Sequence, residues 1–286
     1  MKFFSIFLLL FLSLSAPLNP KAFAADYHSA RTAALGGAGH AAPLLNDTIY
    51  LNPSYAAFTE TQNLSTSWQS YKGKDAGTGH KGHVVHVSAF DGRSPLFHAG
   101  LGYTKRPGAT FINVGAGKSV IERTGFGVGG KYFFNSHQNG QDFNLSFSGI
   151  LTEWFYTSLM IDNLLQTETG KDFGLLREFN LGMKANIMSI VLVYLDPHIT
   201  PHRPSDLRFG ASLGLEFVLM KDLFFRMGFF KNEPIPFQTS RSRGVAIGFG
   251  WFAPRFSLDY GFQRVNHSDP GRPVTLAHNF GFTLFL

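Results

Sequence analysis

The amino-acid sequence predicts an all-β fold: a transmembrane antiparallel β-barrel of about fourteen strands, preceded by an N-terminal plug. Short segments that alternate apolar with small or polar residues follow one another from residue 62 to residue 286. Charged residues make up 15% of the chain, whereas soluble domains have roughly 25%. Aromatic residues also reach 15%, and Gly and Phe each occur 31 times. This composition is typical of a barrel whose polar lumen face offsets its lipid face.

The first residues predict export. Lys2 is followed by an apolar run over 3–14 and by Ala22-Phe23-Ala24, a small-x-small cleavage pattern. The run is shorter than the roughly 20 residues that a spanning helix needs. We therefore expect residues 1–24 to be a cleaved signal peptide, with an uncleaved anchor as the alternative. Without cysteine, the chain has no disulfide in an oxidising compartment.

Residues 25–61 lack the periodicity of a helix or a strand. The segment is rich in small residues, with a glycine cluster at Gly36, Gly37 and Gly39. Asn52-Pro53 marks a further break in regular structure. We expect this segment to form a plug, or hatch, inside the barrel formed by residues 62–286.

The strands are predicted from alternation, because successive side chains of a strand point to opposite faces. A soluble sandwich is the alternative, but the apolar faces are rich in Phe and Leu and the opposite faces are crowded with Gly, Ala and Ser, which favours a lipid-facing wall. The run over 187–196 is almost continuously apolar, so periodicity does not separate it from a buried helix. The predicted strands are 62–71, 83–90, 97–105, 110–118, 123–134, 141–150, 153–162, 175–186, 187–196, 206–218, 222–231, 243–252, 255–263 and 274–286.

The connections between these strands alternate between long and short. The long ones include 72–82, 163–174 and 232–242, with 105–109 counted among them, and the short ones include 219–221 and 253–254. Outer-membrane barrels have long loops outside and short turns at the periplasmic side. We therefore expect the protein to lie in the outer membrane of a Gram-negative-type bacterium, with both termini in the periplasm. The final strand, with Phe280, Phe282 and Leu284 on one face, needs an edge partner, and closure onto the first strand supplies one.

Three motifs lie in the N-terminal segment: Leu35–Gly39, Asn46-Asp47 and Asn52-Pro53-Ser54-Tyr55-Ala56. They resemble the N-terminal signature of the FadL-like outer-membrane superfamily, with Ser54 in place of the usual Ala. That superfamily includes the long-chain fatty acid transporter and the PorV/PorQ-type barrels of a protein secretion system. The stretches 208–217, 225–229 and 275–286 resemble PorV-type strands. The resemblance implies a fourteen-stranded barrel with an N-terminal hatch. Its hatch motif comprises Gly36, Gly37, Gly39, Asp47, Asn52 and Pro53.

Charged residues on the polar strand faces are expected to point inward, because a lipid-facing charge costs roughly 2–4 kcal/mol at the bilayer midplane. They form either a salt-bridge network that holds the plug or polar guides along a transport path. Phe224 and Phe230 have the same inward parity and supply apolar surface. The predicted lumen or ligand-path residues are Lys131, Glu178, Arg208, Glu216, Arg226, Arg255, Asp259, Phe224 and Phe230.

Motifs for other chemistry are weak. Gly125–Gly130 fits a dinucleotide-binding pattern, but a strand pattern follows it where a helix is needed. His83 and His86 would point to opposite faces of one strand, which disfavours a metal site. No nucleophile–base arrangement stands out, and the net charge of +6 is spread without a basic block. We predict no catalytic residue, no metal, no cofactor and no nucleic-acid partner.

Three interpretations of the function remain open at this point. The first is a passive channel for small hydrophobic molecules, fatty-acid-like if Arg226 or Arg255 meets a carboxylate. The alternative, which the resemblance implies, is a PorV-like barrel that interacts with exported proteins or a secretion apparatus. A purely structural barrel is a third interpretation. The expected partners are membrane lipids with either a hydrophobic small molecule or exported proteins.

Overall fold

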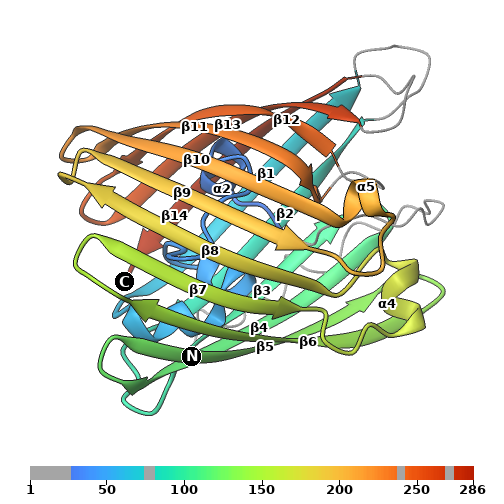
Figure 1. Ribbon diagram of the computed structural model, residues 1–286, viewed down its shortest axis with the longest axis horizontal. Coiled ribbons are helices and arrows are strands. Elements are labelled where there is room, and N and C mark those ends of the chain that lie inside the picture. The colour runs from blue at the N-terminus through green and yellow to red at the C-terminus, as the bar shows by residue number, and fades with distance from the viewer. Residues whose placement is uncertain (1–26, 74–80, 237–241, 268–273) are drawn as a thin grey trace, which may run out of the picture.

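The computed structural model describes residues 27–73, 81–236, 242–267 and 274–286. Its strands form one closed antiparallel barrel in which each strand pairs with its sequence neighbours and β14 pairs with β1 (Figure 1). This confirms the predicted fold class and the strand number. The strands are β1 (Gln62–Gly73), β2 (Lys81–Asp91), β3 (His98–Arg106), β4 (Ala109–Ile121), β5 (Thr124–Phe134), β6 (Asn139–Ile150), β7 (Phe155–Asp162), β8 (Glu178–Ile187), β9 (Val191–Ile199), β10 (Phe209–Met220), β11 (Leu223–Glu233), β12 (Ser242–Phe252), β13 (Phe256–His267) and β14 (Thr275–Phe285).

The ambiguous apolar run over 187–196 contains a turn rather than a helix. Met188 and Ser189 have φ of 54° and 58°, and Ile187 pairs with Val191 across the turn. Two consecutive residues with positive φ are typical of the tight hairpin turns that match strand twist. Because the turn itself is apolar, neither the alternation pattern nor typical turn residues marked where β8 ends and β9 begins.

The alternation predicted from the sequence corresponds to two faces of the wall. On β12, Val245, Ile247, Phe249 and Trp251 are each 45–48% exposed, whereas Ala246 between them is 3% exposed. The exposed side chains form an apolar outer surface, which is the arrangement that a barrel needs in lipid. None of the helices in the described part of the chain is long and apolar enough to cross a membrane.

The two ends of the barrel differ (Figure 1). Connections that carry α4 (Glu168–Asp172) and α5 (Ser205–Arg208) lie at one end, which we call the loop end. The other end, the turn end, has short links such as 122–123 and 221–222. One expected long connection, 105–109, is wrong: β3 ends at Arg106 and β4 begins at Ala109, so Pro107 and Gly108 alone join them. Gly108 has φ of 80°, which lets a two-residue Pro-Gly turn close the hairpin.

Residues 27–61, called the inner segment below, lie inside the barrel (Figure 1). They contain α2 (Ala30–Ala34), α3 (Asp47–Leu51) and the 3-10 helix η1 (Pro53–Phe58). Helix α2 contacts β11 to β14, and η1 contacts β3 to β6. Ser29 caps α2, since its hydroxyl accepts from the Thr32 backbone and the Thr32 side chain accepts from the Ser29 backbone. Three helices of five or six residues are too short to give a periodic sequence signal.

Glycines on the inner wall allow this packing. A Cβ atom on Gly228 of β11 would collide with the Gly36 backbone, and one on Gly127 of β5 would collide with the Ser54 backbone. The backbones of the inner segment and the wall therefore touch where the wall has no side chain. The small residues that crowd the inner face in the sequence therefore allow the inner segment to pack directly against the wall.

Candidate functional site

A buried ionic cluster joins the inner segment to the wall. Arg226 of β11 lies between Glu216 of β10 and Asp259 of β13 and bonds to both. Arg31 of α2 approaches the same Glu216 carboxylate, with 3.4 Å between Nε and Oε2. Arg31 also donates to the Tyr194 hydroxyl at 2.8 Å. Three of the predicted lumen residues, Glu216, Arg226 and Asp259, thus lie together.

Arg31 was missed by the sequence reasoning. It belongs to the aperiodic inner segment, so no strand parity indicated where its side chain points. Helix α2 packs against β11 to β14, and from there the Arg31 side chain reaches Tyr194 of β9 and Glu216 of β10. The predicted parity identified Glu216, Arg226 and Asp259, which belong to the wall, but it did not identify Arg31, which belongs to the inner segment.

Lys131 and Glu178 lie apart from this cluster, near the loop end. The Lys131 ammonium is 2.8 Å from Asp162 Oδ1 and donates to Asn163 Oδ1 at 3.0 Å. Glu178 accepts from the Thr200 hydroxyl at 2.8 Å. Lys131 in β5 and Glu178 at the start of β8 are both buried.

Arg208 and Arg255 do not lie in the lumen, and their prediction as path residues is wrong. Arg208 is the last residue of α5 and is exposed at the loop end, because β10 begins one residue later at Phe209. Arg255 is exposed in the turn before β13, which begins at Phe256. In both cases the alternation was extended past the real strand end, where parity no longer fixes direction.

The two predicted phenylalanines lie toward opposite ends of β11. Phe230, near the loop end, is 5% exposed in a cluster with Tyr71, Val84, Ile235, Val265 and Ala277. Phe224, near the turn end, packs edge-on against Phe252, and its ring centre is 5.8 Å from the Arg226 guanidinium carbon. A second apolar cluster at the loop end consists of Ala109, Phe111, Phe133, Phe173 and Leu175. Two apolar clusters of the inner surface therefore lie at the loop end, whereas Phe224 and Phe252 pack together near the turn end.

The glycines of the predicted hatch motif form the turn after α2. Gly36, Gly37 and Gly39 have φ of 69°, 93° and 142°, values that side chains strongly disfavour. The turn docks on Asp196 of β9, whose Oδ2 accepts from the Gly39 backbone at 2.7 Å and from the His40 backbone at 2.8 Å. The His40 ring Nδ1 is also 2.8 Å from this oxygen.

The polar residues of the motif bind other parts of the inner segment and the wall. Asp47 accepts from the Tyr27 hydroxyl and, at 3.0 Å, from Ser29. The Asn52 side chain donates to the His40 carbonyl at 2.7 Å and to the Ser148 hydroxyl of β6 at 2.8 Å. Pro53 begins η1, where its missing N–H is not needed. These contacts join parts of the inner segment to one another and to β6.

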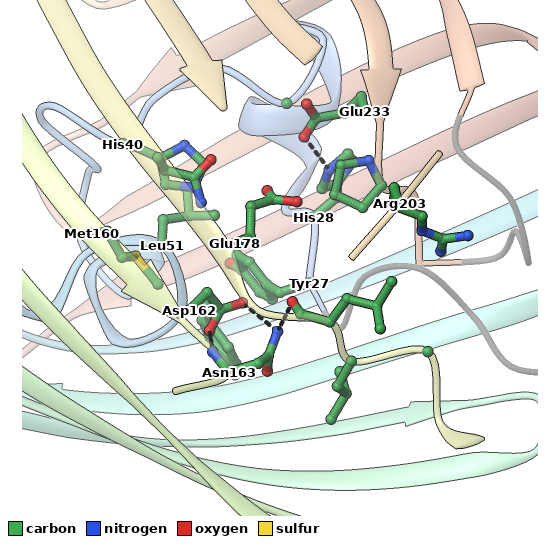
Figure 2. A pocket seen from close by; sticks show the side chains of 17 residues that line it. Tyr27, His28, His40, Leu51, Met160, Asp162, Asn163, Glu178, Arg203 and Glu233 are labelled. Atoms are coloured by element: carbon green, nitrogen blue, oxygen red, sulfur yellow. Dashed lines mark hydrogen bonds and ion pairs between the residues drawn. The ribbon is translucent and has the colours of Figure 1, made fainter. Parts of the chain in front are cut away.

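Two cavities border the inner segment. The one toward the loop end, called the loop-end cavity below, measures about 50 Å³ (Figure 2). The second lies between the inner segment and strands β1, β2, β13 and β14 and measures about 40 Å³. A cavity that binds benzene has about 150 Å³, so neither space admits a small aromatic molecule in this conformation. The loop-end cavity is lined by Tyr27, His28, Gly37, His40, Tyr50, Leu51, Met160, Asp162, Asn163, Gly174, Leu175, Leu176, Glu178, Asn180, Arg203, Glu233 and Pro234.

Comparison with known proteins gives structural neighbours only. No family model and no curated protein matches the sequence. Among solved structures, the Pseudomonas putida toluene transporter TodX superposes with a TM-score of 0.68 at 12% identity, covering 93% of this chain and 99% of its own. The Ralstonia pickettii toluene transporter TbuX gives 0.67 at 10% identity, covering 94% and 99%. A Pseudomonas aeruginosa FadL homologue gives 0.59 at 10% identity, covering 92% and 98%.

The chain has the same closed β-barrel fold as these toluene transporters and the FadL homologue. This confirms the fourteen-stranded barrel that the motif resemblance implied. Because the identities are only 10–12%, these neighbours establish the shared fold, and the molecule that this barrel transports has to be argued from its own residues.

Proposed function

We propose that this chain is a passive outer-membrane channel for small hydrophobic molecules, with the inner segment as its hatch. The observation that carries the proposal is that the inner segment lies in the lumen of a closed FadL-like barrel. Buried contacts bind it to the barrel wall. The neighbouring structures include transporters of toluene, a small apolar molecule, which supports the same class of cargo.

The transport path begins at the loop end, which faces outward if the usual barrel orientation applies. Two apolar clusters there, around Phe230 and around Phe111 and Phe133, offer surface for a hydrophobic molecule to leave water. The cavities beyond them are too small for passage, so the inner segment has to shift. Both termini would then lie at the periplasmic side.

A fatty-acid-like cargo is the finer version of this proposal. It depended on Arg226 or Arg255 as a partner for a carboxylate. Arg226 already binds Glu216 and Asp259, and Arg255 is exposed in a turn. The fatty-acid-like cargo therefore stays a prediction without an assigned carboxylate partner. The alternative of a PorV-like barrel that binds exported proteins also stays a prediction.

A disulfide lock tests the hatch. The Ala30 Cβ of α2 lies 3.2 Å from a Cβ atom built on Gly281 of β14, close to the 3.5–4.5 Å that a disulfide spans. The natural chain has no cysteine, so Ala30→Cys with Gly281→Cys creates a single defined pair. In cells with an intact lipopolysaccharide layer, toluene uptake should fall to the level of cells without the protein when the pair is oxidised. Reduction should restore it.

The two single-cysteine variants serve as controls, since neither can close the lock. Their uptake should match that of the natural protein under oxidising and reducing conditions. Uptake that stays high in the oxidised double variant would rule out a moving hatch. Uptake that never exceeds that of cells without the protein would rule out the channel and favour the secretion-type barrel.

A further inference from the structure

We propose that the outer wall of the barrel binds a phosphorylated lipid of the leaflet at the loop end. The phosphate lies on a set of exposed basic side chains, and the acyl chains lie in an apolar groove beside them. The basic set, called the basic arc below, consists of Lys72, Lys81, Lys231, Arg243 and Arg264. The site is on the outside of the barrel, so this inference does not depend on what the lumen transports.

The basic arc lies at the loop end of neighbouring strands. Its residues belong to β2, β1, β13, β12 and β11, which are consecutive in the barrel apart from β14 between β1 and β13. Each residue shares its parity with outward-facing residues of its strand, as Lys72 does with Trp68 and Lys231 does with Phe229. The five side chains therefore point away from the lumen.

The charge of the arc is one-sided. Within the described ranges, the loop-end halves of β1, β2 and β11 to β14 have no outward-facing Asp or Glu, and Asp91 of β2 faces outward only at the turn end. On β4 to β10, the outward residues nearest the loop end are uncharged, among them Thr110, Ile161 and Phe209. Snorkelling of basic side chains to a membrane interface would place cations around the whole ring. An arc on one side indicates a local anionic ligand.

Two cations of the arc lie directly opposite each other. Lys72 of β1 pairs with Lys81 of β2 in the antiparallel ladder. The Cβ atoms of such a pair are about 4.5–5.5 Å apart, and like charges in this position destabilise a sheet. An anion between the two ammonium groups removes this repulsion, and clustered Lys and Arg side chains at a membrane surface are typical of sites for anionic head groups.

Arg264 lies close enough to act on the same head group. Lys72 and Arg264 both lie opposite Leu276 of β14, one on each side of it. A strand spacing of about 4.8 Å puts their backbones about 10 Å apart, which two long side chains bridge through one phosphate. A phosphate monoester has a charge of about −1.5 to −2 at neutral pH and three acceptor oxygens, so it can bind several of these donors at once.

An apolar groove lies on the same side of the barrel, closer to the turn end. It measures about 510 Å³, more than three times the cavity of about 150 Å³ that binds benzene. Asp259, the one charged residue among the described residues that line it, is bound to Arg226. The outward-facing aromatic residues of the groove come from β1 and β12 to β14 and are Trp68, Phe249, Trp251, Tyr260, Phe280 and Phe282.

The spacing of the arc and the groove fits a lipid. Trp68 is four positions from Lys72 on β1, and Tyr260 is four positions from Arg264 on β13. Four residues of a strand span about 13 Å, which is about 10 Å along the membrane normal at a tilt of 35–45°. The head-group layer on each side of a bilayer is roughly 5–8 Å thick. When the arc lies in this layer, the groove lies beside the acyl chains of the same leaflet.

A second copy of the chain fits this face less well. Two copies related by a two-fold axis along the membrane normal would bring their basic arcs together at the same height. Like charges that face each other across an interface oppose association. A phosphorylated lipid supplies both the opposite charge and the apolar chains.

The test uses three matched molecules: dioleoylphosphatidic acid, dioleoylglycerol, which has the same chains without the phosphate, and glycerol 3-phosphate, which has the phosphate without the chains. Native mass spectrometry of the full chain in a mild detergent measures their binding. Phosphatidic acid should bind about tenfold more tightly than dioleoylglycerol, the effect of hydrogen bonds between charged groups. Glycerol 3-phosphate should bind more weakly than phosphatidic acid by about tenfold or more, because it leaves the groove empty.

Two variants separate the arc from the groove. Lys72→Gln combined with Arg264→Gln should reduce the binding of phosphatidic acid to the level of dioleoylglycerol. Phe280→Ala, which removes a ring that stacks on Trp68 in the groove, should weaken both lipids by a similar factor. Lys118→Gln combined with Lys221→Gln is the matched control, because it removes two exposed cations near the turn end and should leave both lipids unchanged.

A heat-dependent shift in gel mobility shows that each variant is a folded barrel. Equal binding of phosphatidic acid and dioleoylglycerol would overturn the inference, and so would equal effects of the arc and control double variants. Binding of glycerol 3-phosphate as tight as that of phosphatidic acid would also overturn it, because the arc would then be a site for free phosphate.

Discussion

Arg226 has no exposed surface and lies between the buried Glu216 and the partly buried Asp259. Replacing it with Met keeps most of the side-chain volume but removes the cation that these two carboxylates share, and Arg31 remains beside Glu216 alone. We expect Arg226→Met to lower the free energy of unfolding by about 3–5 kcal/mol, the usual cost of breaking a buried ion pair on one side. Equilibrium urea unfolding in detergent measures it. Arg208→Met, at an exposed position, should change the value by less than about 0.5 kcal/mol, and equal effects would contradict the assignment.

His40 makes the docking of the glycine turn dependent on pH. Burial alone would lower the pKa of His40, but its hydrogen bond to Asp196 and the charge of that carboxylate raise the pKa above its ordinary value. A raised pKa means that the charged ring stabilises the docked state below about pH 6.5, the unfolded value. This stabilisation is lost as the pH rises through the folded value.

Amide hydrogen exchange of residues 36–40, corrected for intrinsic rates, should therefore show stronger protection at pH 6 than at pH 8.5. In His40→Gln the difference should disappear, while the backbone bonds of Gly39 and residue 40 to Asp196 remain. Protection that is equal at both pH values in the natural protein would contradict the role of the ring.

At the scale of elements, the contact between η1 and β5 gives a test of the hatch that needs no cysteine. A side chain at Gly127 points into the Ser54 backbone, whereas one at Gly130 on the same strand meets only Phe143, at 3.9 Å. Gly127→Val should displace η1 without breaking any strand ladder, so the barrel should insert and its conductance in planar bilayers should rise. Gly130→Val should leave conductance unchanged. Equal conductance in both variants would show that η1 does not close the lumen.

The strands could be predicted from the sequence, because apolar and small or polar side chains alternate along each of them. The apolar side chains face lipid in every strand. All fourteen predicted ranges overlap a strand. The errors lie at strand ends, where parity no longer fixes the direction of a side chain, and they wrongly placed Arg208 and Arg255 in the lumen. The turn at Met188 was hidden because its residues are as apolar as the strands beside it.

At the scale of the whole molecule, the sites were not predictable from local pattern. The ionic cluster needs Arg31 from an aperiodic segment beside Glu216 from β10. The loop-end cavity joins His28, Glu178 and Glu233, which lie far apart in the chain and meet only because the ring closes around the inner segment. Side-chain parity indicates which residues face inward, but not which of them meet.

Ring closure also has a consequence for how the protein is made. Every ladder except one joins strands that are adjacent in the sequence, so most pairings form between hairpin neighbours with a small entropic cost. The exception joins β1 to β14, where Asn63 pairs with Phe285. The strand that is synthesised first thus keeps an open edge until the last one is made. Throughout that interval the nascent chain exposes an unpaired apolar edge, which makes protection from aggregation a requirement of its biogenesis.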